Sequence, residues 1–228
     1  MTKVYLLTRS EASVPTGEDW LTEEERATLA GFRFPKRRAE WRLGRWTARQ
    51  ALAAALEVPF AEVAVRAAPD GAPEALLHGA PAPVALSLSH RDGVAACALA
   101  PHPVALGCDL ERIEPRTPAF VADYFTPSER AIMARTPSRA HARTANLIWS
   151  AKECALKALR TGLRLDTRAV EVAFPEAPSV HGWRPFTVAY VGEDRRFDGW
   201  WRQAGAHLLT VAADPPPAPP VQLRPNAA

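Results

Sequence analysis

The chain has few cysteines and no long hydrophobic run. Three cysteines occur among 228 residues, an odd number, and each lies in an apolar context. We therefore expect reduced core residues, and we exclude a disulfide framework or a cysteine-based zinc site. No apolar run approaches the length of a membrane span, and the first residues lack the long apolar region and the cleavage site of a signal peptide. These absences predict a cytoplasmic protein that has no membrane partner.

Histidine is scarce as well. The chain has six histidines. The five other than His90 show no mutual spacing typical of metal ligands, and we assign them no role. The rest of the composition is that of a globular protein, because hydrophobic residues make up 47% and charged residues 23% of the chain. The length exceeds one average domain and falls short of two large ones.

The patterning predicts helices and strands on both sides of a joint at Pro101-His102-Pro103. A helix-then-strands order occurs on each side, although no residue-level repeat is visible. We expect the Pro-rich segment from Pro215 onward to be a loose, extended end. The expected helices are 22–30, 36–57, 117–124, 126–134 and 141–160, and the expected strands are 3–8, 62–66, 84–89, 93–100, 104–110, 169–174, 186–191 and 206–212.

Positive charge is concentrated in the helix predicted at 36–57. Arg38, Arg42, Arg45 and Arg49 are spaced by four, three and four residues, which places them on one helical face. Three interpretations of this arginine stripe are open. It can be a solvated surface, a nucleic-acid-binding face with interleaved tryptophans, or a binding face for a phosphate-rich small molecule or an acidic protein.

Two acidic residues lie at the end of the strand predicted at 104–110. Side chains alternate between the two faces of a strand. Asp109 and Glu111 should therefore point to one side, and Cys108 and Leu110 to the other. An isolated pair of this kind is usually a solvated strand end, so its meaning depends on what lies next to it.

A further set of polar residues lies on the helix predicted at 141–160, which has no Gly or Pro between residues 148 and 160. Trp149, Glu153 and Lys157 are four residues apart and share a face. We expect Trp149 to pack against the core, and Lys152 either to reach a phosphate or to lie on the surface. If this helix crosses the strand end, three carboxylates and an ammonium converge. Such oxygen ligands suit Mg²⁺, and Lys157 would offset the charge of a diphosphate.

Ser89 and His90 end a short alternating strand and precede a turn signal. The order Ser-His, then Gly-x-Asp-x-Glu, then Trp-x-x-Lys-Glu-x-x-x-Lys resembles the 4′-phosphopantetheinyl transferases. The likeness is to the larger, single-chain type that serves polyketide and nonribosomal peptide synthetases. It extends from about Leu21 to Val211.

The resemblance implies an α/β (α+β) fold of two similar halves related by a pseudo-twofold axis, with coenzyme A in the cleft between them. The halves are residues 1–102 and 103–214, and a Pro-rich tail follows at 215–228. The resemblance also implies that the protein is a monomer and that its site residues are these: Asp109, Glu111 and Glu153 for Mg²⁺; Arg45, Arg38, Ser89, His90 and Lys157 for coenzyme A; and Glu153, Lys157 and Asp109 for catalysis.

One position departs from the family pattern. Many members carry Gly-Lys-Pro shortly before the Ser-His strand, and its basic residue helps to hold coenzyme A. Here the matching segment is Asp70-Gly71-Ala72-Pro73, with alanine in place of the base. Either the arginine-rich helix supplies this charge, or coenzyme A binds more weakly by about 1–2 kcal/mol, or the copy is impaired. The intact set of acidic residues makes impairment the least favoured explanation.

The expected reaction is transfer of the 4′-phosphopantetheine arm of coenzyme A to a serine of an apo acyl or peptidyl carrier protein, with release of 3′,5′-ADP. Glu153 is the candidate base, metal ligand or both. The alternatives are a metal-dependent nuclease or phosphatase and a non-enzymatic nucleic-acid-binding protein. The first leaves Ser89 and His90 without a task, and the second leaves the carboxylates unexplained. We therefore expect no nucleic-acid partner.

Overall fold

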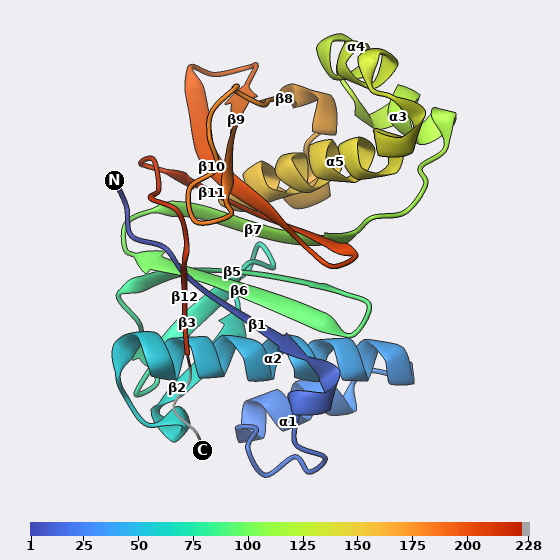
Figure 1. Cartoon of the computed structure of the whole chain (residues 1–228). Helices are drawn as coiled ribbons and strands as arrows, with labels where there is room; N and C mark the ends of the chain where they lie inside the picture. The colour runs from blue at the N-terminus through green and yellow to red at the C-terminus, as the bar shows by residue number, and fades with distance from the viewer. Residues whose placement is uncertain (225–228) are drawn as a thin grey trace.

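The computed structural model describes residues 1–224 and has a mixed α/β architecture (Figure 1). In the N-terminal half the elements are β1 (Tyr5–Ser10), α1 (Glu23–Ala30), α2 (Pro35–Leu56), β2 (Val63–Ala67), β3 (Pro73–Leu77), β4 (Ala80–Pro81), β5 (Val84–Arg91) and β6 (Val94–Pro101). In the C-terminal half they are β7 (Ala105–Arg112), α3 (Pro118–Tyr124), α4 (Pro127–Arg135), α5 (His141–Ala158), β8 (Val170–Ala173), β9 (Arg184–Tyr190), β10 (Arg195–Ala204) and β11 (His207–Asp214), and β12 (Val221–Gln222) follows.

The two halves share a strand connectivity, and this supports the expected repeat. In the first sheet the order is β12-β1-β6-β5, and in the second it is β7-β11-β10-β9-β8. The first strand of each half therefore pairs antiparallel with the last strand, which in turn pairs with the strand before it. A small separate sheet, β2-β3-β4, belongs to the N-terminal half.

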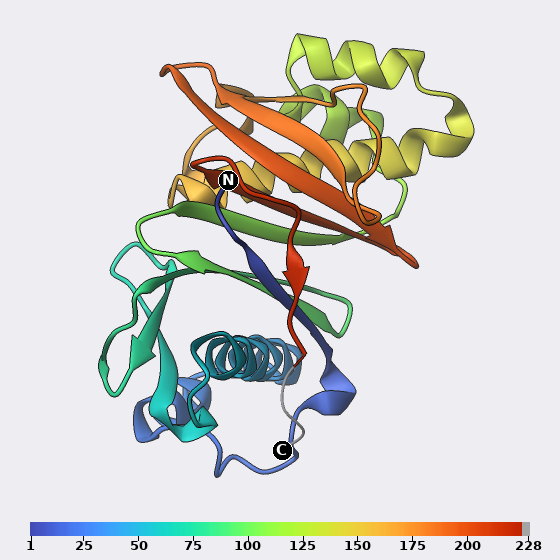
Figure 2. The same ribbon diagram turned by 60° about the vertical axis from the view of Figure 1, so that its left-hand side comes forward.

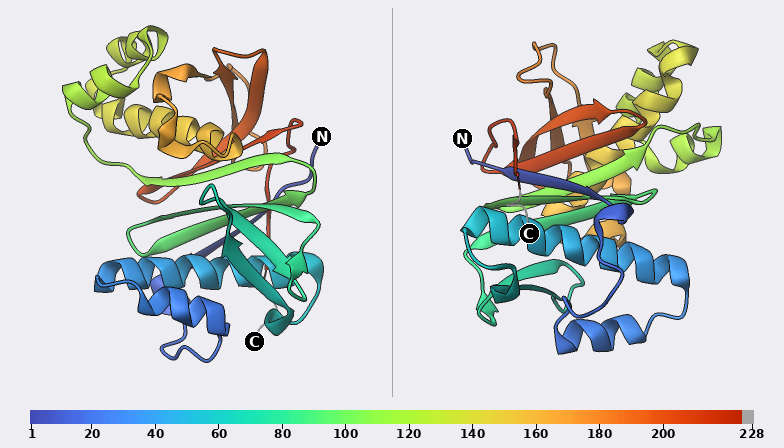
Figure 3. Two further views of the ribbon diagram at one scale, coloured as in Figure 1. Left: turned by 180° about the vertical axis from the view of Figure 1, so that it is seen from behind. Right: turned by 60° about the horizontal axis from the view of Figure 1, so that its bottom comes forward.

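The elements form layers, with α2 on one outer side and α5 on the other (Figure 1, Figure 2). One core lies between α2, its sheet and the β2–β3 strands, which flank α2 in Figure 3. A second core lies between the two sheets, and a third between α5 and the second sheet. Each core holds one cysteine: Cys97, Cys108 and Cys154 are all buried and free. The expectation that the cysteines lie in the core is confirmed.

Two of the helices, α1 and α4, begin at a capping box. Thr126 and Glu129 form a capping box at the start of α4, with Pro127 in the first turn. Thr22 and Glu25 form the same arrangement at α1. Such a box satisfies two backbone N–H groups that a helix leaves free, so it fixes where the helix begins.

The structure contains four strands that the sequence analysis does not predict: β3, β4, β10 and β12. The most extensive is β10, in which charged residues and Gly199 interrupt the apolar alternation. Pairing with β9 on one side and β11 on the other makes it a strand in spite of this composition. Tertiary pairing overrides local propensity here.

The expectation of a loose C-terminal end is wrong for the residues that the structure describes. Thr2 forms a parallel bridge with Pro217, and Val221 and Leu223 donate backbone hydrogen bonds to Val4 and Leu6 of the first strand region (2.9 and 2.8 Å). Figure 2 shows this segment returning from the C-terminal half to lie beside β1. The segment is extended, as expected, but it is bound as a sheet edge. Residues 225–228 of the predicted tail lie outside the described residues.

Within residues 1–224, none of the helices combines the length and apolarity that a membrane crossing requires.

Candidate active site

The strand β7 separates polar from apolar side chains as its alternation predicts. Cys108 and Leu110 lie in the core between the sheets. Gly107, Asp109 and Glu111 face α5, and a Cβ added at Gly107 would collide with the backbone of Cys154 in that helix. The absence of a side chain at Gly107 therefore lets α5 approach the strand closely enough to meet Asp109 and Glu111.

The expected face of α5 is the one that meets β7. Trp149 donates its indole N–H to Glu111 (3.0 Å), and Lys157 donates its ammonium to Asp109 (2.7 Å). Lys157 also lies 3.8 Å from Glu153 one turn earlier. Trp149 is nearly buried among aromatic neighbours, as expected of a packing residue, and in addition it fixes the orientation of Glu111.

Asp109 lies at the centre of this contact and is almost fully buried. Its Oδ1 accepts hydrogen bonds from Ser89 (2.9 Å) and Lys157 (2.7 Å). Its Oδ2 accepts one from Ser150 of α5 (2.8 Å). Three side chains from two elements, β5 and α5, thus hold one carboxylate in place, and the ammonium compensates its charge.

Glu111 has partners other than Lys157. Its Oε1 accepts a hydrogen bond from the indole of Trp149, and its Oε2 accepts one from Arg116 (3.2 Å) in the segment before α3. Burial and the neighbouring Asp109 raise the pKa of Glu111, and Arg116 opposes this rise. Glu111 is therefore satisfied by partners of its own and points less freely toward the other carboxylates than the sequence suggests.

Glu153 is the most perturbed carboxyl group of the site. Burial, followed by the negative charge of Asp109, raises its pKa to about 7, while Lys157 opposes the rise. A group with this pKa exchanges its proton near neutral pH, which is the property that proton transfer requires. Burial by itself lowers the pKa of Lys157, but Asp109 and Glu153 together raise it, so Lys157 stays an ammonium.

Ser89 and His90 lie on opposite faces of β5. The Ser89 hydroxyl is bound to Asp109, while the alternation of the strand turns His90 toward α2, with Leu86 and Leu88. Burial lowers the pKa of His90, and the charges of Glu40 and Arg37 in α2 act on it. The resemblance assigns both residues to coenzyme A. In the structure, however, Ser89 points to Asp109 and only His90 points toward α2.

The arginine stripe is not an open surface, contrary to its interpretation as a solvated helical face. Arg42 donates to the carbonyl groups of residues 16 and 17 (3.0 and 2.7 Å). Arg49 is buried, pairs with Glu25 (3.1 Å), and donates to the carbonyl of Trp20. These arginines fasten α1 and the segment before it to α2. This use leaves no continuous stripe for a polynucleotide backbone.

The two candidate coenzyme A arginines of this stripe are also engaged. Arg38 donates to the carbonyl of Leu29 (2.7 Å). Arg45 stacks over Trp41 at 4.9 Å, lies 4.0 Å from Glu25, and is only 12% exposed. Arg38 is 35% exposed and also pairs with Glu18 (3.3 Å), so the guanidinium groups of both arginines have partners within the protein. Their assignment to coenzyme A stays a prediction.

Lys152 has a structural role. The predictions that it reaches a phosphate or lies on the surface are both wrong. It is fully buried and pairs with buried Glu129 at 2.8 Å. It also donates to the carbonyl groups of Thr167 and Val170. Burial lowers the pKa of Lys152 and Glu129 opposes the change. Lys152 therefore joins α5 to α4 and to the start of β8.

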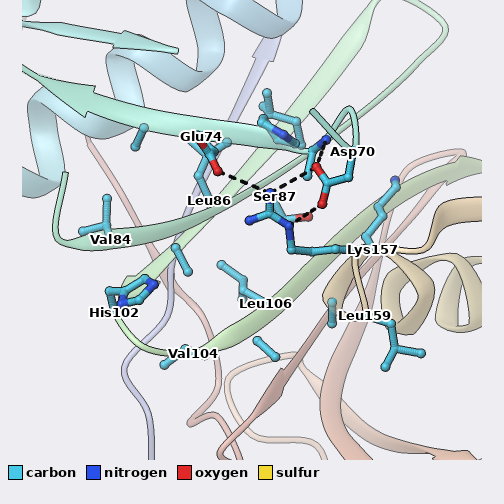
Figure 4. Close-up of a pocket in the computed structure, with 18 of the residues that line it drawn as sticks. Asp70, Glu74, Val84, Leu86, Ser87, His102, Val104, Leu106, Lys157 and Leu159 are labelled. Carbon is cyan, nitrogen blue, oxygen red and sulfur yellow. Dashed lines mark hydrogen bonds and ion pairs between the residues drawn. The ribbon is translucent and has the colours of Figure 1, made fainter. Parts of the chain in front are cut away.

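A cavity of about 1190 Å³ lies between the two halves, with walls from β3, β5, the β6–β7 connection and the end of α5 (Figure 4). Lys157 lines it, which connects the cavity to the carboxylate cluster. Arg45, Arg38, Ser89, His90, Asp109, Glu111 and Glu153 are not among its lining residues. A cavity of this size accommodates a cofactor-sized ligand.

Three residues of the site escape the sequence reasoning. Ser150 lies three positions before Glu153, so helical spacing alone could have identified it as a ligand of Asp109. Arg116, in the loop before α3, donates to Glu111, and Arg91, at the end of β5, donates to Glu114. No local sequence pattern predicts these two contacts.

Among residues 1–224, no three or more His, Cys, Asp or Glu side chains are gathered closely enough to form a metal cage. The kind of donor nevertheless fits a hard divalent cation, because the carboxyl groups of Asp109 and Glu153 lie close enough to raise the pKa of Glu153. The ammonium of Lys157 lies against both groups. A positive charge is thus part of the arrangement, and Asp109 and Glu153 are the residues that would share a cation.

Two family models match the chain. The model of the 4′-phosphopantetheinyl transferase superfamily matches residues 105–191, and that of the 4′-phosphopantetheinyl transferase N-terminal domain matches residues 24–100. No curated protein matches the chain. The two matches lie on either side of the joint between the halves and agree with the larger single-chain type. The chain belongs to the 4′-phosphopantetheinyl transferase superfamily and is a transferase.

Proposed function

We propose that this chain transfers the 4′-phosphopantetheine arm of coenzyme A to a serine hydroxyl of an apo acyl or peptidyl carrier protein. The observation that carries the proposal is the cluster of Asp109, Glu153 and Lys157 beside the cavity between the halves. In this reaction the serine oxygen bonds to the β-phosphorus of coenzyme A, the bond from that phosphorus to the bridging oxygen breaks, and 3′,5′-ADP leaves. The coenzyme is a co-substrate, and the protein acts as a monomer with no nucleic-acid partner.

Glu153 takes the proton of the attacking serine. Its pKa of about 7 keeps a large share of the group unprotonated at neutral pH while leaving it basic enough to accept a proton. The rate should therefore rise with pH as Glu153 ionises and level off about one pH unit above the pKa of this group. A cation held by Asp109 and Glu153 would favour the carboxylate and shift this profile to lower pH.

Lys157 compensates charge on the transferring phosphoryl group. Transfer of this kind depends mainly on positioning and on neutralising oxygen charge. Lys157 lines the cavity and is held by Asp109, which Ser89 and Ser150 hold in turn. Its ammonium is thus fixed at the edge of the ligand space.

Asp109 and Glu153, with Glu111 behind them, are the residues that would hold Mg²⁺. When bound, the ion would supply further neutralisation of the diphosphate charge. The activity should therefore depend on Mg²⁺.

Neither alternative function gains support from the structure. A nuclease or a nucleic-acid-binding protein would need the arginine stripe as a phosphate-binding face, and those arginines instead hold the segment at 15–25.

Intact-protein mass spectrometry of an apo carrier protein, incubated with this chain, coenzyme A and Mg²⁺, tests the proposal. The expected result is a mass gain of one phosphopantetheine arm, which is lost with chelator and reduced at least about 100-fold in Glu153→Gln. Glu153→Gln is preferred to an Asp109 variant because Asp109 has several structural partners. Asp166→Asn, an exposed carboxylate paired with Arg168, is the matched control and should behave as wild type.

No mass gain on a panel of carrier proteins, or full activity in Glu153→Gln, would contradict the proposal. Magnesium-dependent cleavage of an oligonucleotide without any reaction of coenzyme A would favour the nuclease.

A further inference from the structure

A fully buried serine lies in the middle of α5. A serine there has no favourable helix propensity, and its hydroxyl commonly points to solvent or bonds to the carbonyl group four residues earlier. Thr47 in α2, which is equally buried, makes that second kind of bond by donating to the carbonyl of Leu43 (2.8 Å). The hydroxyl of Ser150 instead donates to Oδ2 of Asp109 in β7 (2.8 Å). Ser150 therefore serves the strand that α5 meets and not its own helix.

A second hydroxyl lies behind Ser150. Thr210 of β11 pairs with Asp109 of β7 in the antiparallel ladder, so both side chains point to the same face of the sheet, toward α5. The Thr210 side chain is fully buried, its hydroxyl lies 2.9 Å from the Ser150 hydroxyl, and it donates to the carbonyl of Ser150 (3.2 Å). Polar groups from β7, α5 and β11 thus form one connected network in the interior.

The number of protons fixes the direction of this network. Asp109 is paired with the ammonium of Lys157 (2.7 Å), and as a carboxylate it can only accept hydrogen bonds. Ser150 has one hydroxyl proton, so this proton goes to Asp109. Thr210 is then the donor at the contact between the two hydroxyls, and it shares its proton with the carbonyl of Ser150. The bonds run from Thr210 to Ser150 to Asp109, and each donor in such a chain polarises the next.

The partners of Asp109 divide between its two oxygen atoms. Lys157 and Ser89 both donate to Oδ1, whereas Ser150 donates to Oδ2. Among residues 1–224, Ser150 is the only hydrogen-bond donor to Oδ2. Without the Ser150 hydroxyl, Oδ2 would be left unpartnered in the interior, and the carboxylate would turn about its bond to Cβ. Ser150 therefore fixes the rotation of this carboxylate.

The Ser150 hydroxyl has two opposing effects on a cation held by Asp109. Its hydrogen bond draws charge from Oδ2, which weakens the attraction of the carboxylate for the cation. It also keeps the carboxylate in one orientation, so that less freedom is lost on binding. In metal sites, removal of an orienting outer partner generally weakens binding about 10- to 100-fold. The effect of orientation is therefore the larger of the two.

We propose that Ser150, with Thr210 behind it, is a positioning residue of the site, which acts through Asp109 and sets the affinity of Asp109 and Glu153 for a divalent cation. The inference rests on the proposed function and on the Mg²⁺ dependence proposed there. Both hydroxyls are fully buried, so they act through Asp109 and not on the reacting atoms. The site thus extends through α5 to β11, the neighbour of β7 in the second sheet.

The test is binding of Mn²⁺ to the full chain saturated with coenzyme A, without a carrier protein. Carboxylates suit Mn²⁺ as well as Mg²⁺. The electron paramagnetic resonance signal of free Mn²⁺ measures binding apart from catalysis, and coenzyme A without protein is the blank. We expect Ser150→Ala to weaken Mn²⁺ binding at least about tenfold. The half-saturating Mg²⁺ concentration in the carrier-protein assay should rise by a similar factor, whereas the rate at saturating Mg²⁺ should largely recover.

Two substitutions of Thr210 separate positioning from packing. Thr210→Val keeps the volume of the side chain and removes its hydroxyl, whereas Thr210→Ser keeps the hydroxyl and removes a methyl group. We expect Thr210→Val to weaken Mn²⁺ binding, by less than Ser150→Ala does, and Thr210→Ser to leave it unchanged although the lost methyl group lowers thermal stability. Thr47→Val removes a buried hydroxyl from α2 and is the matched control, with unchanged Mn²⁺ binding.

Unchanged or tighter Mn²⁺ binding in Ser150→Ala would overturn the inference while leaving the transfer reaction standing. Equal weakening in Thr210→Ser and Thr210→Val would overturn it as well, because packing would then be the cause. A wild type that transfers the phosphopantetheine arm and binds no Mn²⁺ would refute the inference and the role of the cation, but not the transfer. Absence of both transfer and coenzyme A binding would refute the proposed function and this inference together.

Discussion

At the scale of single residues, Glu153 shares the ammonium of Lys157 with Asp109, and burial and the charge of Asp109 raise the pKa of Glu153 from 4.5 to about 7. The folded protein therefore binds this proton more tightly than the unfolded chain between those two values. By linkage, the free energy of unfolding falls as pH rises through this window.

We predict that the metal-free protein loses up to about 3 kcal/mol of stability between pH 4.5 and 7 through Glu153. Glu153→Gln should remove that loss and be more stable than wild type at pH 8. Urea unfolding in the presence of chelator at several pH values measures the effect. Glu176→Gln, at an exposed position, should follow the wild-type curve, and a Glu153→Gln curve that also follows it would contradict the prediction.

The buried pair of Lys152 and Glu129 belongs to the same scale. Removing one partner of such a pair leaves an uncompensated charge in the core. We predict that Lys152→Met destabilises the protein by about 3–5 kcal/mol, and that adding Glu129→Gln recovers part of the loss. Denaturant unfolding measures both.

Lys36→Met is the control for this pair, because Lys36 makes an exposed contact with Glu40 at 3.9 Å. Its effect should stay within about 0.5 kcal/mol. A similar small effect for Lys152→Met would show that the buried pair is not required.

At the scale of elements, the contact of α5 with β7 builds the site, and Gly107 sets its distance. An alanine there would push its methyl group into the backbone of Cys154. We predict that Gly107→Ala costs about 1–3 kcal/mol or more and also lowers transfer activity, because α5 carries Glu153 and Lys157. Thermal unfolding and the carrier-protein assay measure the two effects.

Gly44 offers the matched control in α2. A methyl group there meets nothing within 4 Å, so Gly44→Ala should stabilise the protein by about 0.5–1 kcal/mol. If both substitutions had the same sign, packing of α5 against β7 would not be the explanation.

The elements also show where local patterns succeed. The shared face of Trp149, Glu153 and Lys157 depends only on the helical repeat, and the split between Asp109 and Cys108 depends only on strand alternation. The arginine stripe follows the same helical repeat, but its meaning is decided by the segment at 15–25, which folds over it. Spacing predicts which side chains share a face and not what covers that face.

At the scale of the whole molecule, the C-terminal segment connects the end of the second half to the sheet of the first. Val221 donates to Val4, and the ladder alternation turns the N–H of Gln222 away from β1. We predict that Val221→Pro lowers the free energy of unfolding by about 1–2 kcal/mol, whereas Gln222→Pro costs less. The midpoint of thermal unfolding should fall by about 2–8 °C in the first variant only. Equal shifts in both would contradict a bound edge strand.

The sequence by itself determined the helices, most strands, the faces of β7 and α5, and the family, because these follow from short-range periodicity and from motifs contiguous in the chain. Only the tertiary structure decided that Lys152 is buried, that three arginines of α2 hold the N-terminal segment, and that Val221–Gln222 pairs with β1. It also decided that Arg160, just after α5, donates to the carboxylate of Asp70 in the other half. Each of these depends on a partner remote in the chain, and burial beside that partner changes the energetic value of a charge or a backbone hydrogen bond.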